Sequence, residues 1–238
     1  MAGHSKWANI KHRKERADQK KGKVFSRIMK EVISAVKQGG SDPKSNNKLR
    51  TAIQKAKEVN IPTDNIDRNI KKAASSDQTD FVEMTYELYG YGGVGIIADI
   101  MTDNKNRISS DIRIATNKCG GTVAAPGAVA YNFDRRGVLR VAKDAAEESR
   151  LFELAIEAGA ENFSSDEEGY LITTSVEDFL KVKEALTQAA IKIEEAELAM
   201  VPKIWVEVSD TDADANIALI EWLEKLDDVD AVYHNMQT

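Results

Sequence analysis

The stretch GYGGVGIIADIMT, residues 90–102, decides which kind of α/β fold the chain can adopt. Its first six residues match the pattern G-x-G-x-x-G letter for letter. In a dinucleotide-binding site such glycines lead into a helix, whose N-terminus meets the pyrophosphate. Here they lead into Ile-Ile-Ala-Asp-Ile, which its β-branched residues mark as a strand. We therefore interpret the glycines as a turn between two strands, 81–89 and 94–102, and not as a nucleotide site.

The pattern of elements continues on the C-terminal side of this turn. A helix over 104–118, ended by Gly120-Gly121, precedes a strand over 128–133. The next stretch predicts strand 138–142, helix 147–158, strands 160–164 and 169–174, helix 176–189 and strand 193–200. This βαββαβ order is the ferredoxin-like arrangement. Beyond Pro202 we expect a strand over 203–208, a helix over 212–226 and a final strand over 229–234.

Two of these segments are incomplete by themselves. The segment 79–133 has too few elements for a two-layer domain, and the tail 204–238 cannot stand alone. We expect the two to pair as one discontinuous α/β domain, with the ferredoxin-like unit, 134–203, inserted between them.

The N-terminal segment, 1–78, predicts three short helices. Apolar residues from Phe25 to Val36 fall on one face of a helix over 24–38, which Gly39-Gly40 ends. A second helix passes through Leu49 to Val59, and Thr63 caps a third. The predicted fold class is therefore α+β and multidomain: an N-terminal three-helix basic domain plus two α/β domains, one ferredoxin-like and inserted in the other.

Charge is distributed very unevenly along the chain. Residues 1–75 hold 19 Lys/Arg and 7 Asp/Glu, a balance of +12, whereas the remaining residues have a balance of −18. This asymmetry predicts a basic module for a polyanion attached to an acidic body. We expect phosphate contacts from the basic arm and the first helix, with Trp7 stacking on a base or packing on the helices. The candidate nucleic-acid-binding residues are Lys6, Trp7, Lys11, His12, Arg13, Lys14, Lys20, Lys21, Lys23, Arg27 and Lys30.

Other functional classes find little support. Cys119, the single cysteine, has no identifiable base, and His4 and His12 have no metal-ligand partners nearby, so we expect no catalytic residues, metal or cofactor. The acidic pairs Glu147-Glu148, Glu194-Glu195 and Asp227-Asp228 are typical of solvated helix ends and turns. The ferredoxin-like unit lacks the paired aromatics of an RNA-recognition motif, which favours a partner-binding or scaffolding role; a metabolite sensor is a further alternative. No apolar run is long enough for a membrane span, and we expect no signal peptide, because the N-terminus is basic and has no apolar stretch.

The chain also resembles a known family. Gly3-His4-Ser5-Lys6-Trp7-Ala8-Asn9-Ile10-Lys11-His12-Arg13-Lys14 is similar to the start of the YebC/PmpR family, and the likeness continues in Thr102-Asp103-Asn104-Lys105-Asn106-Arg107 and Leu226-Asp227-Asp228-Val229. It covers essentially the whole chain, with departures at Tyr91 and at 123–126. The resemblance implies a helical N-terminal domain, two α/β domains and no enzyme activity.

The family resemblance leaves two functions open. Family members are described as DNA-binding transcriptional regulators, whereas others, including a mitochondrial translational activator of cytochrome oxidase, act in translation on ribosomes. We therefore expect a regulator that binds DNA, with a ribosome-associated factor binding ribosomal RNA as the alternative. Protein partners would meet the acidic α/β domains. We expect a bacterial cytoplasmic protein, not a membrane or imported one, and a monomer is the working assumption.

Overall fold

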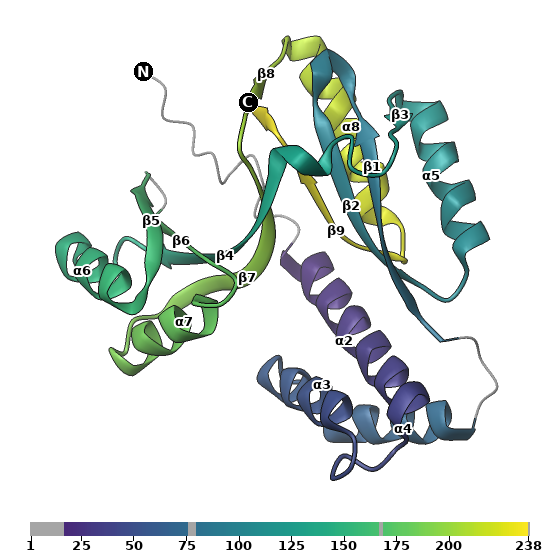
Figure 1. The fold of residues 1–238 in the computed structure, drawn as a ribbon, viewed down its shortest axis with the longest axis vertical. Helices are drawn as coiled ribbons and strands as arrows, with labels where there is room; N and C mark the ends of the chain where they lie inside the picture. Colours follow the sequence, from purple (N-terminus) through teal and green to yellow (C-terminus); the bar gives the residue numbers. More distant parts are fainter. Residues whose placement is uncertain (1–16, 76–79, 167–168, 238) are drawn as a thin grey trace.

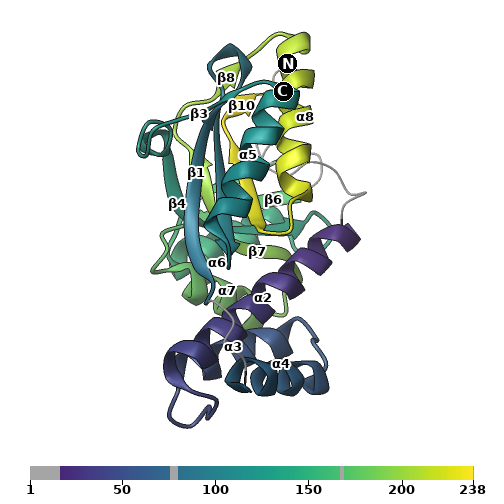
Figure 2. The same ribbon diagram turned by 90° about the vertical axis from the view of Figure 1, so that its right-hand side faces the viewer.

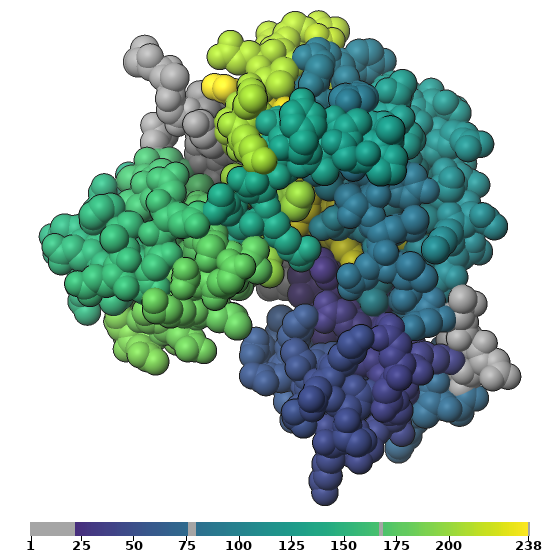
Figure 3. All heavy atoms as spheres, viewed as in Figure 1, coloured from purple at the N-terminus to yellow at the C-terminus, as the bar shows by residue number. Residues whose placement is uncertain are grey.

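The computed structural model describes residues 17–75, 80–166 and 169–237, with side chains described from Gly22 onward. It confirms the α+β, multidomain fold class (Figure 1). Figure 3 shows a helical lobe, a ferredoxin-like lobe and a central lobe, with an open space between the first two. Within the described residues, no helix has both the length and the apolar character needed to cross a membrane.

The helical lobe consists of three helices, α2 (Ala17–Gly39), α3 (Asn47–Glu58) and α4 (Thr63–Ser75). Their apolar faces meet in a core that includes Val32, Leu49 and Ile66. Asn46 ties α3 to α2, since its side chain accepts from the Leu49 N–H and donates to the carbonyls of Ala35 and Gly40. Helix α2 begins earlier than the predicted residue 24, because good helix formers surround Gly22, the one poor helix former in that turn.

The central lobe contains a four-stranded sheet in the order β3-β1-β2-β9. Its strands are β1 (Val82–Tyr89), β2 (Gly95–Thr102), β3 (Thr122–Val123) and β9 (Val229–His234), and β9 pairs antiparallel with β2. Helices α5 (Lys105–Cys119) and α8 (Asp210–Lys225) lie side by side on one face (Figures 1 and 2). The sheet thus takes strands from both sides of the ferredoxin-like unit.

The glycine-rich stretch is a turn between strands, as the sequence predicted. A single 3-10 turn, η2 (Tyr91–Gly93), connects β1 to β2, and no helix follows the glycines. Gly92 and Gly93 have φ values of 66° and 83°, a region that side-chain-bearing residues rarely adopt. This geometry excludes the helix N-terminus that a dinucleotide site of this pattern requires.

The ferredoxin-like unit has the predicted order of elements. It consists of β4 (Phe133–Ala142), α6 (Glu148–Ala158), β5 (Ala160–Ser165), β6 (Gly169–Thr174), α7 (Phe179–Gln188) and β7 (Ile193–Pro202). The sheet order is β5-β6-β4-β7, with every neighbouring pair antiparallel. Ile97 and Tyr233 of the central sheet share a buried cluster with Val138 and Ala199 of this unit, so an apolar contact joins the two α/β parts.

Two predicted strands differ from the structure. Residues 128–133 do not form a separate strand: η3 (Ala130–Asn132) is a 3-10 turn, and Phe133 begins β4. The Glu87 carboxylate accepts the backbone N–H groups of Val129 and Ala130, which would otherwise take part in a sheet. The strand predicted over 203–208 shrinks to β8 (Val206–Glu207), which pairs with β10 (Met236–Gln237). Here the Asn132 side chain satisfies both backbone groups of Ile204.

Candidate nucleic-acid interface

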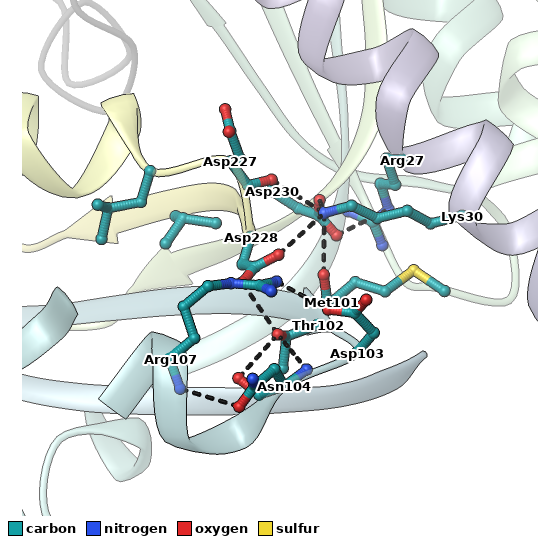
Figure 4. Close-up of polar contacts among 12 residues, drawn as sticks. Arg27, Lys30, Met101, Thr102, Asp103, Asn104, Arg107, Asp227, Asp228 and Asp230 are labelled. Carbon is teal, nitrogen blue, oxygen red and sulfur yellow. Dashed lines mark hydrogen bonds and ion pairs between the residues drawn. The ribbon is translucent and has the colours of Figure 1, made fainter. Parts of the chain in front are cut away.

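The candidate residues fall into three groups in the structure. Lys6, Trp7, Lys11, His12, Arg13 and Lys14 lie outside the described residues, and so do the side chains of Lys20 and Lys21, whose backbone belongs to α2. The side chains of Lys23, Arg27 and Lys30 are described. They lie along one face of α2, which meets the turn between α8 and β9. Figure 4 shows Arg27 and Lys30 of this face. We call residues 226–230 the acidic turn.

Lys23 and Lys30 donate to the backbone of the central lobe. The Lys23 ammonium lies 3.0 Å from the Leu226 carbonyl oxygen and 2.7 Å from that of Val229. The Lys30 ammonium lies 2.9 Å from the carbonyl oxygens of both Met101 and Asp227. Only 8% of Lys30 is exposed, so in this arrangement its ammonium is out of reach of a phosphate.

The carboxylate of Asp230 lies between the side chains of Lys30 and Arg27. It is 3.8 Å from both Lys30 Nζ and Arg27 Nε. Burial raises the pKa of Asp230 above its ordinary value, although Lys30, Arg27 and Lys23 act in the opposite direction. Burial likewise lowers the pKa of Lys23, against the attraction of Glu224 and Asp230. For Asp230 and Lys23, burial therefore outweighs the attraction of neighbouring opposite charges. For Arg27, burial acts to lower the pKa, but the attraction of Asp230 and Glu31 outweighs it and the pKa is raised.

Asp228 has two roles: its Oδ1 lies 4.0 Å from Lys30 Nζ of α2, and its Oδ2 belongs to a network within the central lobe (Figure 4). Its Oδ2 accepts from the Thr102 hydroxyl at 2.9 Å and from Arg107 Nη2 at 2.7 Å. The Asn104 side chain caps α5 directly beside this group. Arg107 and Asp228, which are 121 residues apart in the chain, thus meet in one network together with Asp103 (Figure 4). The prediction that the Asp227-Asp228 pair is solvated was wrong for Asp228, which is 6% exposed, because it is the shared acceptor of this network.

The contact between α2 and the central lobe is polar. Each buried apolar cluster that includes α2 residues contains only residues of α2, α3, α4 and the segment between them. The apolar clusters of the α/β parts contain none of the α2 residues whose side chains are described. Ion pairs and hydrogen bonds from Lys23, Arg27 and Lys30 therefore dominate this contact.

A second set of cations remains exposed on the helical lobe. They lie on the turn before α3, on α3 and on α4, and comprise Lys44, Lys48, Arg50, Lys55, Lys57, Arg68, Lys71 and Lys72. Lys55 forms an ion pair with Glu31, while Arg50 and Lys57 line a groove of about 470 Å³ between α3 and α4. We call this the α3–α4 groove; Pro43, Ile53, Gln54, Thr63, Ile66 and Asp67 complete its lining.

The candidate residues named from the sequence lie in the arm and α2 and do not include Arg50 or Lys57, which the structure places on the exposed surface of α3. A signal was available, because the twelve residues of α3 carry four cations and one acid, Glu58. Cys119 is a free, half-buried thiol at the end of α5. Within the described part of the chain, no group of three or more His, Cys, Asp or Glu residues is placed to hold a metal ion.

Comparison with known proteins places this architecture in a family. The family model "TACO1/YebC protein N-terminal domain" matches residues 5–76, and "TACO1/YebC second and third domain" matches residues 81–236. The chain is 64% identical to a probable transcriptional regulatory protein of Protochlamydia amoebophila, over 100% of this chain and 97% of that protein. It is 58% identical to one of Chlamydia pneumoniae, over 99% of this chain and 100% of that protein. The crystal structure of a conserved hypothetical protein from Aquifex aeolicus is 40% identical and superposes with a TM-score of 0.80, over 98% of this chain and 97% of that one. The chain therefore belongs to the TACO1/YebC family, as its resemblance to YebC/PmpR sequences predicted.

Proposed function

We propose that this chain is a non-enzymatic, nucleic-acid-binding regulatory protein whose N-terminal domain contacts phosphates. The observation that carries the proposal is the exposed cationic surface of α3 and α4, on a segment with a charge balance of +12. Cations on such a surface attract a polyanion and release its counterions on binding. The rest of the chain, with a balance of −18, repels phosphates and so confines binding to this lobe.

Regulation of transcription through DNA is the form of this function that the names of the relatives support. A ribosome-associated factor that binds ribosomal RNA and eases translation is the alternative. Phosphate contacts carry no sequence information, so one basic surface serves either polyanion. The two forms of the function predict different outcomes of a competition: the protein prefers duplex DNA if it regulates transcription, and ribosomes if it acts in translation.

Charge reversal in the α3–α4 groove tests the proposal. In Arg50→Glu/Lys57→Glu, we expect affinity for duplex DNA or for ribosomes to fall at least about tenfold at 0.15 M salt, because two phosphate contacts become repulsive. The matched control is Lys143→Glu/Lys181→Glu, which changes the net charge equally at two exposed positions of the ferredoxin-like unit. Equal losses in the two double variants would show that net charge alone, and not this surface, determines binding.

Co-sedimentation identifies the partner. The chain is pelleted with ribosomes through a cushion at about 0.15 M salt, where weak phosphate attraction is screened, with and without excess duplex DNA. If duplex DNA removes the protein from the pellet, DNA is the preferred partner. If the protein pellets despite the DNA and the groove variant does not, ribosomal RNA is the partner. If the wild-type chain binds neither polyanion, the proposal fails.

A further inference from the structure

We propose that Lys23, Arg27 and Lys30 form a second phosphate-binding surface, which the acidic turn covers as an intramolecular competitor. Nucleic acid and the acidic turn would then compete for the same three cations, so that binding separates α2 from the central lobe. This inference rests on the proposed function and adds to it a surface that is hidden in the unbound chain.

The spacing of the cations suits a polyanion. Lys23, Arg27 and Lys30 are separated by four and three residues, which places them in a row about 10 Å long on one face of α2. Exposed rows of this kind are typical of contacts with successive backbone phosphates. In the unbound chain, however, the row faces protein, as Figure 4 shows for Arg27 and Lys30.

The acidic turn and its neighbour β2 present the oxygens that a phosphate backbone would present. Carbonyl oxygens of Leu226, Asp227 and Val229 accept from Lys23 and Lys30, and the Asp230 carboxylate lies between Lys30 and Arg27. Arg27 also pairs with Glu31, one turn further along α2. Phosphate oxygens accept from Lys and Arg as these oxygens do, but a phosphate cannot reach the buried Lys30 ammonium while the turn remains in place.

Separation of the two surfaces costs little. The contact lacks a shared apolar cluster among the described side chains, so opening it exposes mainly charged and polar groups to water. The buried charges regain hydration when the contact opens, which offsets the lost attraction. The α2–α3–α4 lobe has its own core and can move as a unit.

Asp230→Asn tests this competition with little change in shape. We expect the variant to bind a fluorescein-labelled 20-base-pair duplex, or an RNA hairpin of equal length, about five- to tenfold more tightly than the wild-type chain at 0.15 M salt. The matched control is Asp214→Asn, an equal change of charge at an exposed position of α8, for which we expect less than a twofold change. Asp227→Asn, in the same turn but exposed, provides a second variant whose folding is not at risk.

A distance measurement separates competition from a general effect of charge. Dyes at Ser45→Cys and Ser110→Cys, in a Cys119→Ser background, report the separation of the helical lobe from α5. We expect energy transfer to fall when the duplex or the hairpin is added. Unchanged transfer on binding, or equal affinities of Asp230→Asn and Asp214→Asn, would overturn the inference while leaving the proposed function in place. Failure of the wild-type chain to bind either probe would overturn both.

Discussion

Replacement of Asp228 by alanine is expected to lower the free energy of unfolding of the central lobe by about 3 kcal/mol. The carboxylate is buried and accepts from Thr102 and from two nitrogens of Arg107. The Thr102 hydroxyl is fully buried, so it loses an acceptor that water cannot replace. Arg107 is half exposed and can turn toward solvent, which limits the loss on that side.

Urea denaturation followed by tryptophan fluorescence measures this effect, because Trp205 and Trp222 both lie next to or within the central lobe. The control is Asp227→Ala, the adjacent carboxylate, whose side chain is exposed; we expect a change within about 0.5 kcal/mol. Equal destabilisation by the two alanine variants would show that the Asp228 network contributes no more than an ordinary surface residue.

Glu87→Gln is expected to destabilise the chain by a similar amount, about 3 kcal/mol. The Glu87 carboxylate accepts three backbone N–H groups, from Gly127 at 2.6 Å, Val129 at 2.6 Å and Ala130 at 2.7 Å. Glutamine keeps one acceptor oxygen and turns an amide donor toward N–H groups that also donate. The loop over 124–130 would lose these side-chain contacts to β1 and keep the Ala124 N–H to Glu87 carbonyl bond and the Tyr89 hydroxyl to Ala128 carbonyl bond.

The same carboxylate predicts how stability depends on pH. Burial of Glu87 acts to raise its pKa, but the hydrogen bonds from Gly127, Ala130 and Val129 together outweigh burial, so the pKa lies below its ordinary value of 4.5. The unfolded chain therefore binds the proton more readily than the folded chain. The contribution of Glu87 is complete above about pH 4.5 and is lost as the pH falls through the lower folded-state pKa.

Unfolding free energies at pH 7 and at pH 3 test this dependence. The difference between the wild-type chain and Glu87→Gln is expected to narrow at pH 3, because below its ordinary pKa Glu87 takes up a proton in the unfolded wild-type chain and thereby stabilises the unfolded state. Glu83→Gln, at an exposed position of the same strand, is the control and should follow the wild-type pH profile. A difference of constant size at both pH values would refute the assignment of the acid sensitivity to Glu87.

Regular elements were the part of this fold that the sequence predicted well. The glycine turn before β2, the βαββαβ order and the span of β9 follow from periodicity and from breakers that act within a few residues. The two wrong strands failed for a nonlocal reason. The Asn132 side chain binds the backbone of a residue 72 positions away, and the Glu87 side chain binds one 42 positions away. A local sequence pattern does not predict such distant partners.

For the candidate site, too, the local sequence predicted the type of residue but not its tertiary surroundings. The sequence identified a basic lobe correctly as a concentration of charge, but it could not show which cations face solvent. In the sequence, Lys30 and Arg50 are both simply basic residues of the N-terminal segment. In the structure, Lys30 is buried against the acidic turn, whereas Arg50 is exposed on α3. The difference arises from backbone carbonyls and carboxylates of the central lobe, between 71 and 200 residues further along the chain, which only tertiary packing brings to Lys30.

Photo-crosslinking to nucleic acid tests whether the helical lobe of the full chain binds it, as proposed. Ribosomes and a labelled duplex are each irradiated with the wild-type protein at about 0.15 M salt, and the crosslinked peptides are identified by mass spectrometry. If the N-terminal domain contacts phosphates, crosslinks will lie within residues 1–75 and will include peptides of α3 and α4 that line the α3–α4 groove. Crosslinks concentrated in residues 80–237, with none in the helical lobe, would contradict this proposal.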